Sequence, residues 1–411
     1  MNEIHIISEG KVISRVLSGE RVRDAAAVLE GDVFVVCDRT VLPLAEEIVG
    51  ACAERRDSRP PVIRAVLALE TSEEKKNLDT VMDICRRLLE NGADRGSLVL
   101  AVGGGIATDM AGFAASIYKR GIRFAFVPTT LLAQVDAAIG GKTGVNFLDY
   151  KNMLGVIRQP EWTWISPEPL RTLPLRDFRS GAAELLKTFL IEDRNDNYAR
   201  AVRLLTELCG TQEGGSAPAA CMSPETEREL QELIAGAAAV KAGVVSRDAE
   251  EHGERRKLNL GHTFAHGIES VARRRGYDIS HGEAVAIGIL IAARLAEKLG
   301  LTESPDGPAS GSGPASGGLA ARMAADFAAC GLPTASPFPL EELAEAMTKD
   351  KKAEAGAVRF ILPVAVGTVV EKTLTVREAL DLLGKGQTCP VHTREDASRD
   401  LRDAGATGKE I

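Results

Sequence analysis

The chain has 411 residues, of which 45% are hydrophobic and 26% charged, and these proportions predict a soluble globular protein of two or three domains. Its formal net charge of -8 argues against nucleic acid or an anionic membrane as a partner, because both attract strongly basic surfaces. Seven scattered cysteines, none in a CxxC pair, predict reduced thiols and a cytoplasmic location rather than a disulfide framework.

The first part of the chain alternates short apolar runs with patterns of helical period. Residues 33–37, 97–102 and 124–127 are predicted to be buried strands. Residues 42–54 and 80–90 are predicted to be helices. Strands that alternate with helices are typical of βα units, so we expect an α/β domain built on a parallel sheet.

Beyond residue 174 the pattern becomes mainly helical. Helices are predicted at residues 181–191, 227–245, 263–274 and 284–299, and one later run, 358–366, is predicted to be an arm of a hairpin. The longest apolar stretch covers residues 284–293. It is too short to cross a bilayer, which takes about 20 residues, and no secretory signal is expected at residues 1–8.

These patterns divide the chain into two domains and a tail. We expect an α/β domain over residues 1–170, a mainly α-helical domain over 171–384 and a disordered tail over 385–411. Two segments rich in glycine, serine, proline and alanine, 210–220 and 304–318, are predicted to be flexible surface insertions.

A run of three glycines, Gly103 to Gly105, directly follows the predicted strand 97–102 and precedes a helical pattern. A strand, a glycine turn and a helix N-terminus together favour binding of a pyrophosphate, because backbone N–H groups and the helix dipole face the anion. The spacing is not GxGxxG, and a simple tight turn is an equally good interpretation of this motif alone. Thr129 and Thr130 follow the next predicted strand and are expected at the same sheet edge.

Three of the six histidines fall within one short stretch of the helical half. His262 and His266 are four residues apart and therefore share a helix face, while His281 begins a further helix. Glu184 supplies a carboxylate from a third helix. Two imidazoles, one carboxylate and an open position are typical of a catalytic zinc site. The spacing does not decide which two histidines bind metal, and a polar network between helices is the alternative.

Residues 139–152 carry Lys142 and Asn152 among flexible glycines, a composition that suits an anionic ligand. Other basic residues that are candidates for the same ligand are Arg120, Lys187, Lys241, Arg255, Lys351 and Lys352. Isolated lysines are more often solvated surface charges. The segment GGKTG lacks the GxxxxGK[ST] spacing, which excludes a nucleoside triphosphatase of the Walker type.

With these motifs the sequence resembles the 3-dehydroquinate synthase family over roughly residues 30 to 375. The resemblance rests on the segments GGGIATDMAGFAASIYKRGIRFAFVPTTLLAQVDAAIGGKTGVN, KNMLG, TLPLRDFRSGAAELLK, LNLGHTFAHGIE, HGEAVAIG and DKKAEAGAVRFILP. It implies a Rossmann-like NAD domain, a helical metal-binding domain and a homodimer. It also implies a lyase of aromatic amino acid biosynthesis that converts 3-deoxy-D-arabino-heptulosonate 7-phosphate to 3-dehydroquinate and phosphate.

The resemblance also assigns roles to individual residues. The implied ligands of the metal, zinc or alternatively cobalt, are Glu184, His262 and His281. The implied acid–base residues are His266 and, beside it, Glu251. The implied contacts to NAD are Asp38, Glu73, Lys76, Gly104, Gly105, Ile106, Asp109, Thr129, Thr130, Lys151 and Thr172. The implied contacts to substrate are Arg120, Asp136, Lys142, Asn152, Lys187, Lys241, Arg255, Asn259 and one of Lys351 and Lys352.

Two residues depart from the family pattern. Thr108 stands where many members have glycine, which affects the expected pyrophosphate turn, and Ser180 replaces a larger polar residue, which puts one NAD contact in doubt. Three other functions compete with this interpretation: another sugar phosphate cyclase such as a 2-deoxy-scyllo-inosose synthase, a metal-dependent polyol dehydrogenase, and a nucleotide-binding protein without activity.

Overall fold

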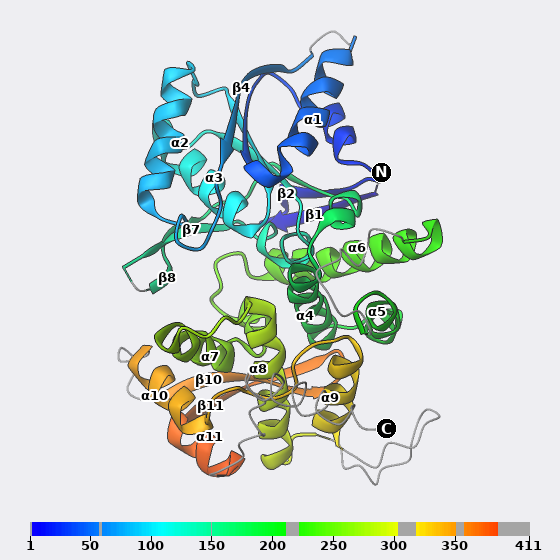
Figure 1. The fold of residues 1–411 in the computed structure, drawn as a ribbon, viewed down its shortest axis with the longest axis vertical. Helices are drawn as coiled ribbons and strands as arrows, with labels where there is room; N and C mark the ends of the chain where they lie inside the picture. Colours follow the sequence, from blue (N-terminus) through cyan, green and yellow to red (C-terminus); the bar gives the residue numbers. More distant parts are fainter. Residues whose placement is uncertain are drawn as a thin grey trace, which may run out of the picture.

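The computed structural model describes residues 2–56, 60–148, 150–210, 222–302, 318–350 and 357–384. An α/β half and a mainly helical half lie one above the other, with helices α4 and α6 between them (Figure 1). Most of the two predicted insertions, the predicted tail, Lys351 and Lys352 lie outside the described residues. Within the described residues no helix is both long enough and apolar enough to cross a membrane.

A seven-stranded sheet organises the α/β half, in the order β1-β2-β9-β6-β5-β3-β4. Its strands are β1 (Asn2–Ser8), β2 (Lys11–Ser18), β3 (Asp32–Asp38), β4 (Val62–Leu69), β5 (Leu98–Gly103), β6 (Arg123–Pro128) and β9 (Trp162–Ile165). Only the β1–β2 pairing is antiparallel; the other neighbours pair in parallel. The predicted central strands are confirmed as β3, β5 and β6.

Helices cover both faces of this sheet. Helix α1 (Leu42–Glu54) packs on one face, while α2 (Leu78–Glu90) and α3 (Gly105–Ile117) pack on the other. The connections that leave β3 and β5 therefore turn to opposite faces, although these two strands are neighbours. Such a topological switch point opens a crevice at the carboxyl ends of the strands, which is where ligands bind in sheets of this kind.

A two-stranded hairpin of β7 (Lys142–Phe147) and β8 (Tyr150–Ile157) lies apart from the main sheet, beside the gap between the halves (Figure 1). Two of its glycines have a clear structural role. Gly144 and Gly155 face each other across the hairpin, and a Cβ added to Gly144 would lie 2.5 Å from the Leu154 carbonyl oxygen. These glycines therefore allow the two backbones to approach.

The second half is helical apart from a hairpin of β10 (Ala357–Ala365) and β11 (Thr368–Thr375), which confirms the predicted hairpin arm. Its helices are α4 (Leu175–Ile191), α5 (Asn197–Leu205), α6 (Pro224–Arg247), α7 (His262–Arg275), α8 (His281–Lys298), α9 (Leu319–Ala329), α10 (Leu340–Asp350) and α11 (Val376–Leu383). Ile6 and Val16 of the first two strands belong to the same apolar core as these helices, so the two halves pack together.

Glycines bring α4, α7 and α8 unusually close together. A Cβ on Gly282 would lie 2.4 Å from the Ser180 Cα in α4, and a Cβ on Gly288 would lie 2.2 Å from the Gly261 carbonyl oxygen. Ser180 Oγ also accepts a hydrogen bond of 3.0 Å from the Gly282 N–H. The first turn of α8 is thereby held against α4, and the start of α7 is held against α8.

Candidate active site

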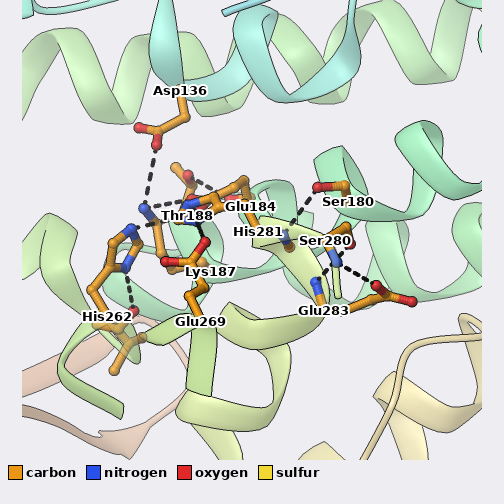
Figure 2. A network of polar contacts seen from close by, with 12 residues as sticks. Asp136, Ser180, Glu184, Lys187, Thr188, His262, Glu269, Ser280, His281 and Glu283 are labelled. Atoms are coloured by element: carbon orange, nitrogen blue, oxygen red, sulfur yellow. Dashed lines mark hydrogen bonds and ion pairs between the residues drawn. The ribbon is translucent and has the colours of Figure 1, made fainter. Parts of the chain in front are cut away.

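Three helices place one carboxylate and two imidazoles together. Glu184 lies in the middle of α4, and His262 and His281 are the first residues of α7 and α8 (Figure 2). One ligand atom from each lies within 4.8 Å of the others. Nε2 of His262 lies 3.7 Å from Glu184 Oε1, and Nε2 of His281 lies 3.3 Å from the same oxygen.

This donor set fits a divalent metal ion. Both Glu184 oxygens are buried and accept no hydrogen bond of good geometry from the described residues, although Lys187 Nζ lies 2.5 Å from Oε2. Two nitrogens and one carboxylate oxygen are the ligands of a catalytic zinc site that keeps a position open for substrate. The geometry therefore brings together Glu184 and the two histidines that the resemblance implied as ligands, His262 and His281.

The electrostatics favour cation binding at Glu184 and His262, whereas His281 must first lose a proton. Burial would raise the pKa of Glu184, but Lys187 and the two histidines hold it well below its usual range. Burial and the Lys187 charge lower the pKa of His262 to about 3. Burial alone would lower the pKa of His281, but the adjacent carboxylates of Glu184 and Glu269 raise it to about 10. Glu184 is thus a carboxylate and His262 a neutral imidazole, while a metal ion bound at His281 would displace a proton.

A buried charge cluster joins this site to the end of the sheet. Lys187 Nζ lies 2.5 Å from Glu184 Oε2 and 3.6 Å from Asp136 Oδ2 (Figure 2). Lys241 of α6 donates to the Asp136 carboxylate and, at 2.6 Å, to its carbonyl oxygen. Asp136 belongs to a short helical turn, Ala133–Ala137, that follows β6. Lys187 and Lys241 therefore lie next to the carboxyl ends of the strands, where both pair with Asp136.

The residues predicted to bind NAD surround the switch point. A Cβ on Gly103 would lie 3.3 Å from the Asp38 Cβ, and a Cβ on Gly104 would lie 3.0 Å from Thr130 Cγ2. Gly104 caps the N-terminus of α3, and the Thr129 N–H donates to the Gly103 carbonyl at 2.9 Å. Side chains would fill this turn, so its glycines leave room for a pyrophosphate at a helix N-terminus.

Thr108, which departs from the family pattern, does not point into this turn. Its side chain is buried, and its hydroxyl donates to the Gly105 carbonyl oxygen at 3.0 Å. The hydroxyl is thus satisfied within the first turn of α3 itself.

A second polar cluster connects the sheet edge to the β7–β8 hairpin. Lys76 Nζ lies 2.6 Å from both Asp109 Oδ2 and Asn152 Oδ1. Lys151 Nζ lies 3.8 Å from Glu73 Oε1 and 3.1 Å from Glu269 Oε1. Predicted cofactor residues and one predicted substrate residue, Asn152, therefore share one network.

The predicted substrate and acid–base residues near η7 (Glu254–Asn259) form a third group. Lys142 Nζ lies 2.5 Å from Glu251 Oε2, and the Asn259 amide donates to Glu251 Oε1 at 3.3 Å. Arg255 is buried and donates to the carbonyl oxygens of Gly140 and Ala249, both at 2.7 Å.

The exposed His266 stacks edge-on against His262 with 5.7 Å between ring centroids. It follows His262 by one helical turn on α7, so it lies beside the metal ligands.

Two predicted residues lie farther from these groups. Arg120 is exposed in η3 (Tyr118–Arg120), which precedes β6 and therefore lies at the opposite edge of the sheet from Thr129 and Thr130. Thr172 is exposed at the end of η5 (Glu168–Thr172), with its hydroxyl 3.3 Å from the Pro169 carbonyl oxygen. Among the described residues, neither Arg120 nor Thr172 has a hydrogen bond or ion pair with Glu184 or with the glycine turn.

Sequence reasoning missed one residue of the site, Glu269. Its carboxylate contacts His281 Nδ1 at 3.2 Å and Lys151 Nζ at 3.1 Å. A signal was available, because Glu269 follows His262 by seven residues and therefore lies on the same face of a helix whose neighbours are apolar.

Solved structures with this fold define the class of the protein. A 2-epi-5-epi-valiolone synthase from Streptomyces hygroscopicus subsp. jinggangensis, with NAD+ and Zn2+ bound, is 27% identical with a TM-score of 0.75, covering 91% of this chain and 96% of that one. A 2-deoxy-scyllo-inosose synthase complexed with carbaglucose-6-phosphate, NAD+ and Co2+ is 23% identical with a TM-score of 0.71, covering 93% and 99%. The fold is thus that of the sugar phosphate cyclases.

Sequence comparison narrows this class to one family. Family models for the N-terminal and C-terminal parts of 3-dehydroquinate synthase match residues 66–180 and 181–353. A 3-dehydroquinate synthase from Pyrococcus abyssi is 39% identical over 319 residues, which are 78% of this chain and 84% of that protein. The chain belongs to the 3-dehydroquinate synthase family.

Proposed function

We propose that this chain converts 3-deoxy-D-arabino-heptulosonate 7-phosphate to 3-dehydroquinate and phosphate with NAD and a divalent metal, zinc or alternatively cobalt. The observation that carries the proposal is the convergence of Glu184, His262 and His281 within 4.8 Å. Lys187 and Asp136 link these ligands to the end of the sheet. When bound, NAD supplies a hydride acceptor and the metal supplies Lewis acidity towards a substrate hydroxyl.

The proposed roles at the cofactor follow from the switch point. The backbone of Gly104 and Gly105 at the start of α3 receives the pyrophosphate, because N–H groups and the helix dipole favour an anion there. Asp38 at the end of β3 is placed to accept hydrogen bonds from a ribose. The proposed contacts beyond these are Glu73, Lys76, Ile106, Asp109, Thr129, Thr130, Lys151 and Thr172.

The proposed substrate residues are cations and amides around the metal ligands. Lys142 and Asn152 of the β7–β8 hairpin hold anionic oxygens of the substrate, and Lys187 and Lys241 offset negative charge that develops during reaction. Arg255 and Asn259, both in η7, are proposed to bind the same substrate. Arg120 and one of Lys351 and Lys352 are proposed on the resemblance alone.

Proton transfer is proposed for His266. Its imidazole is exposed beside His262, so a substrate held at the metal site meets it. Glu251 accepts from Asn259 and pairs with Lys142, and we propose that it keeps these two side chains oriented towards the substrate.

We also propose that the protein is a cytoplasmic homodimer and that each chain has two domains, 1–170 and 171–384. No nucleic acid partner is proposed. The net charge of -8 supports the last point. The cysteines that the structure describes, Cys37, Cys52, Cys85, Cys209 and Cys330, are free thiols, as in a reducing compartment.

Phosphate release from the heptulosonate phosphate, with zinc present and NAD far below the substrate concentration, tests the proposed reaction. We expect many turnovers per NAD without accumulation of NADH, because the hydride returns to the same substrate. Net NADH formation would instead identify a polyol dehydrogenase. Turnover of a different sugar phosphate in place of the heptulosonate would identify a different cyclase of the same fold.

A further inference from the structure

Glu269 is a buried carboxylate that none of the roles proposed above uses. Glu269 lies two turns along α7 from His262, and only 8% of its surface is exposed. Its Oε1 atom lies 3.2 Å from His281 Nδ1 and 3.1 Å from Lys151 Nζ. A buried carboxylate is unfavourable unless it is paired, so these two contacts explain why it is tolerated there.

The contact with His281 fixes which ring nitrogen faces the metal ligands. A carboxylate accepts hydrogen bonds, so Nδ1 carries a proton and donates it to Glu269. The other nitrogen, Nε2, faces Glu184 Oε1 at 3.3 Å (Figure 2). In the neutral ring its lone pair is then directed at the place where the ligand atoms converge.

The other histidine of the site is oriented by a different device. His262 Nδ1 lies 3.1 Å from the Leu260 carbonyl oxygen, so the backbone just before α7 sets its orientation. His281 is oriented by a side chain instead. Only the orientation of His281 can therefore be removed by substituting a single residue.

Lys151 connects this pair to the other half of the molecule. It lies on β8, and its ammonium lies between Glu269 and, at 3.8 Å, Glu73 of the sheet edge. It offsets part of the charge on Glu269, but an ammonium group has no acceptor atom, so it cannot replace the carboxylate as the partner of the Nδ1 proton.

We infer that Glu269 is a positioning residue of the metal site, which holds His281 in the tautomer and orientation that bind a divalent cation. The inference rests on the metal site proposed above. The competing explanation is that Glu269 serves only as an ion pair with Lys151, joining α7 to the β7–β8 hairpin.

Zinc affinity of the purified full chain, measured by competition with a chromophoric chelator after metal removal, separates these explanations. Glu269→Ala is expected to weaken zinc binding about 10-fold to 100-fold, the usual effect of losing such a partner. Glu269→Gln is expected to recover a large part of this loss, because its amide oxygen still accepts from Nδ1. Lys151→Met removes the ion pair but keeps the carboxylate, so its zinc affinity is expected to equal or exceed that of the wild type.

The matched control is Glu342→Gln. Glu342 lies on α10 and pairs at 2.6 Å with Arg275, which is at the end of α7 away from the metal ligands. The zinc affinity of this variant is expected to be unchanged, and thermal melting of each metal-free variant checks the fold. If the wild type binds zinc and Glu269→Ala binds it equally well, or if Lys151→Met loses as much affinity as Glu269→Ala, this inference alone is overturned. If the wild type binds no zinc, the proposed metal site fails, and this inference fails with it.

Discussion

At the scale of single residues, the two histidines of the site differ in how strongly they hold a proton. Burial lowers the pKa of His262 to about 3, and the charge of Lys187 and the neighbouring imidazoles act in the same direction. His281 faces the carboxylates of Glu184 and Glu269, which raise its pKa to about 10. His262 is thus a ready lone-pair donor, while His281 lies between the proposed ligand Glu184 and the second carboxylate, Glu269.

Substitution of His281 by alanine tests whether this ring is a ligand. We expect His281→Ala to lose measurable zinc binding and turnover, because only Glu184 and His262 remain of the three proposed ligands. The metal-free variant is expected to keep the fold, since α8 keeps its capping box between Ser280 and Glu283, but to melt below the metal-free wild type, because two buried carboxylates lose an imidazole partner. His252→Ala removes an exposed imidazole and is the control. Full activity without bound metal would contradict the assignment.

A second residue-scale prediction concerns Lys142, whose side chain is half-exposed on β7 beside Glu251. Lys142→Ala is expected to raise the KM for the sugar phosphate about 10-fold to 100-fold, since a charge-assisted hydrogen bond contributes roughly 1.5–3 kcal/mol. The KM for NAD is expected to change little. Steady-state kinetics with each ligand varied provides the measurement, and Lys298→Ala, at the exposed end of α8, provides the control. Equal effects on both constants would argue against a substrate contact.

At the scale of elements, the close contact between α4 and α8 sets the distance between Glu184 and His281. The Gly282 backbone lies against Ser180 with no space for a side chain. Gly282→Ala is expected to destabilise the fold by about 1–3 kcal/mol, as overpacking does, and also to weaken zinc binding because His281 precedes it directly. Gly50→Ala in α1, where an added Cβ meets nothing within 4 Å, is expected to be neutral or stabilising by up to about 1 kcal/mol.

Urea unfolding and zinc competition together check this prediction. A Gly282→Ala protein that is as stable as the wild type and binds zinc equally well would show that the two helices do not need this contact.

The elements also show where sequence patterns are informative. The central strands β3 and β5 are buried along their length, so each is a continuous apolar run that the sequence displays directly. Helix α1 was predicted with both of its observed ends. The β7–β8 hairpin was missed because its second strand is mostly exposed and both strands contain glycine, so it has no apolar pattern.

The same contrast holds for the site. The spacing of His262 and His266, together with Glu184 and His281, predicted the kind of site because those residue types are rare in helices of the core. The role of Glu269 was not predicted, since its partners come from outside its own helix. His281 is twelve residues away and Lys151 is 118 residues away, and only the folded chain brings them together.

At the scale of the whole molecule, a buried charge cluster joins the two halves. Asp136 comes from the sheet half, while Lys187 and Lys241 come from α4 and α6. Both lysines are buried, and opposite charges at this depth are tolerated only as a balanced set. Burial and the neighbouring Lys187 charge contribute to a lowered pKa of Lys241, and its contact with Asp136 opposes this effect.

Removal of the central carboxylate is therefore expected to destabilise the whole chain. Asp136→Asn leaves two buried ammonium groups with Glu184 as their remaining carboxylate, and breaking a buried pair in this way costs about 3–5 kcal/mol. Asp278→Asn breaks an exposed pair with Arg176 and is expected to change stability by no more than about 1 kcal/mol. The measurement is the free energy of unfolding in urea at constant pH.

A double variant separates loss of charge balance from simple loss of a contact. Asp136→Asn combined with Lys241→Met removes one cation along with the anion, so we expect it to recover part of the stability lost in Asp136→Asn alone. If the double variant is instead less stable by the sum of the two single effects, the cluster is a set of independent contacts. Recovery would show that charge balance at the junction, rather than any one hydrogen bond, keeps the sheet edge and the metal ligands together.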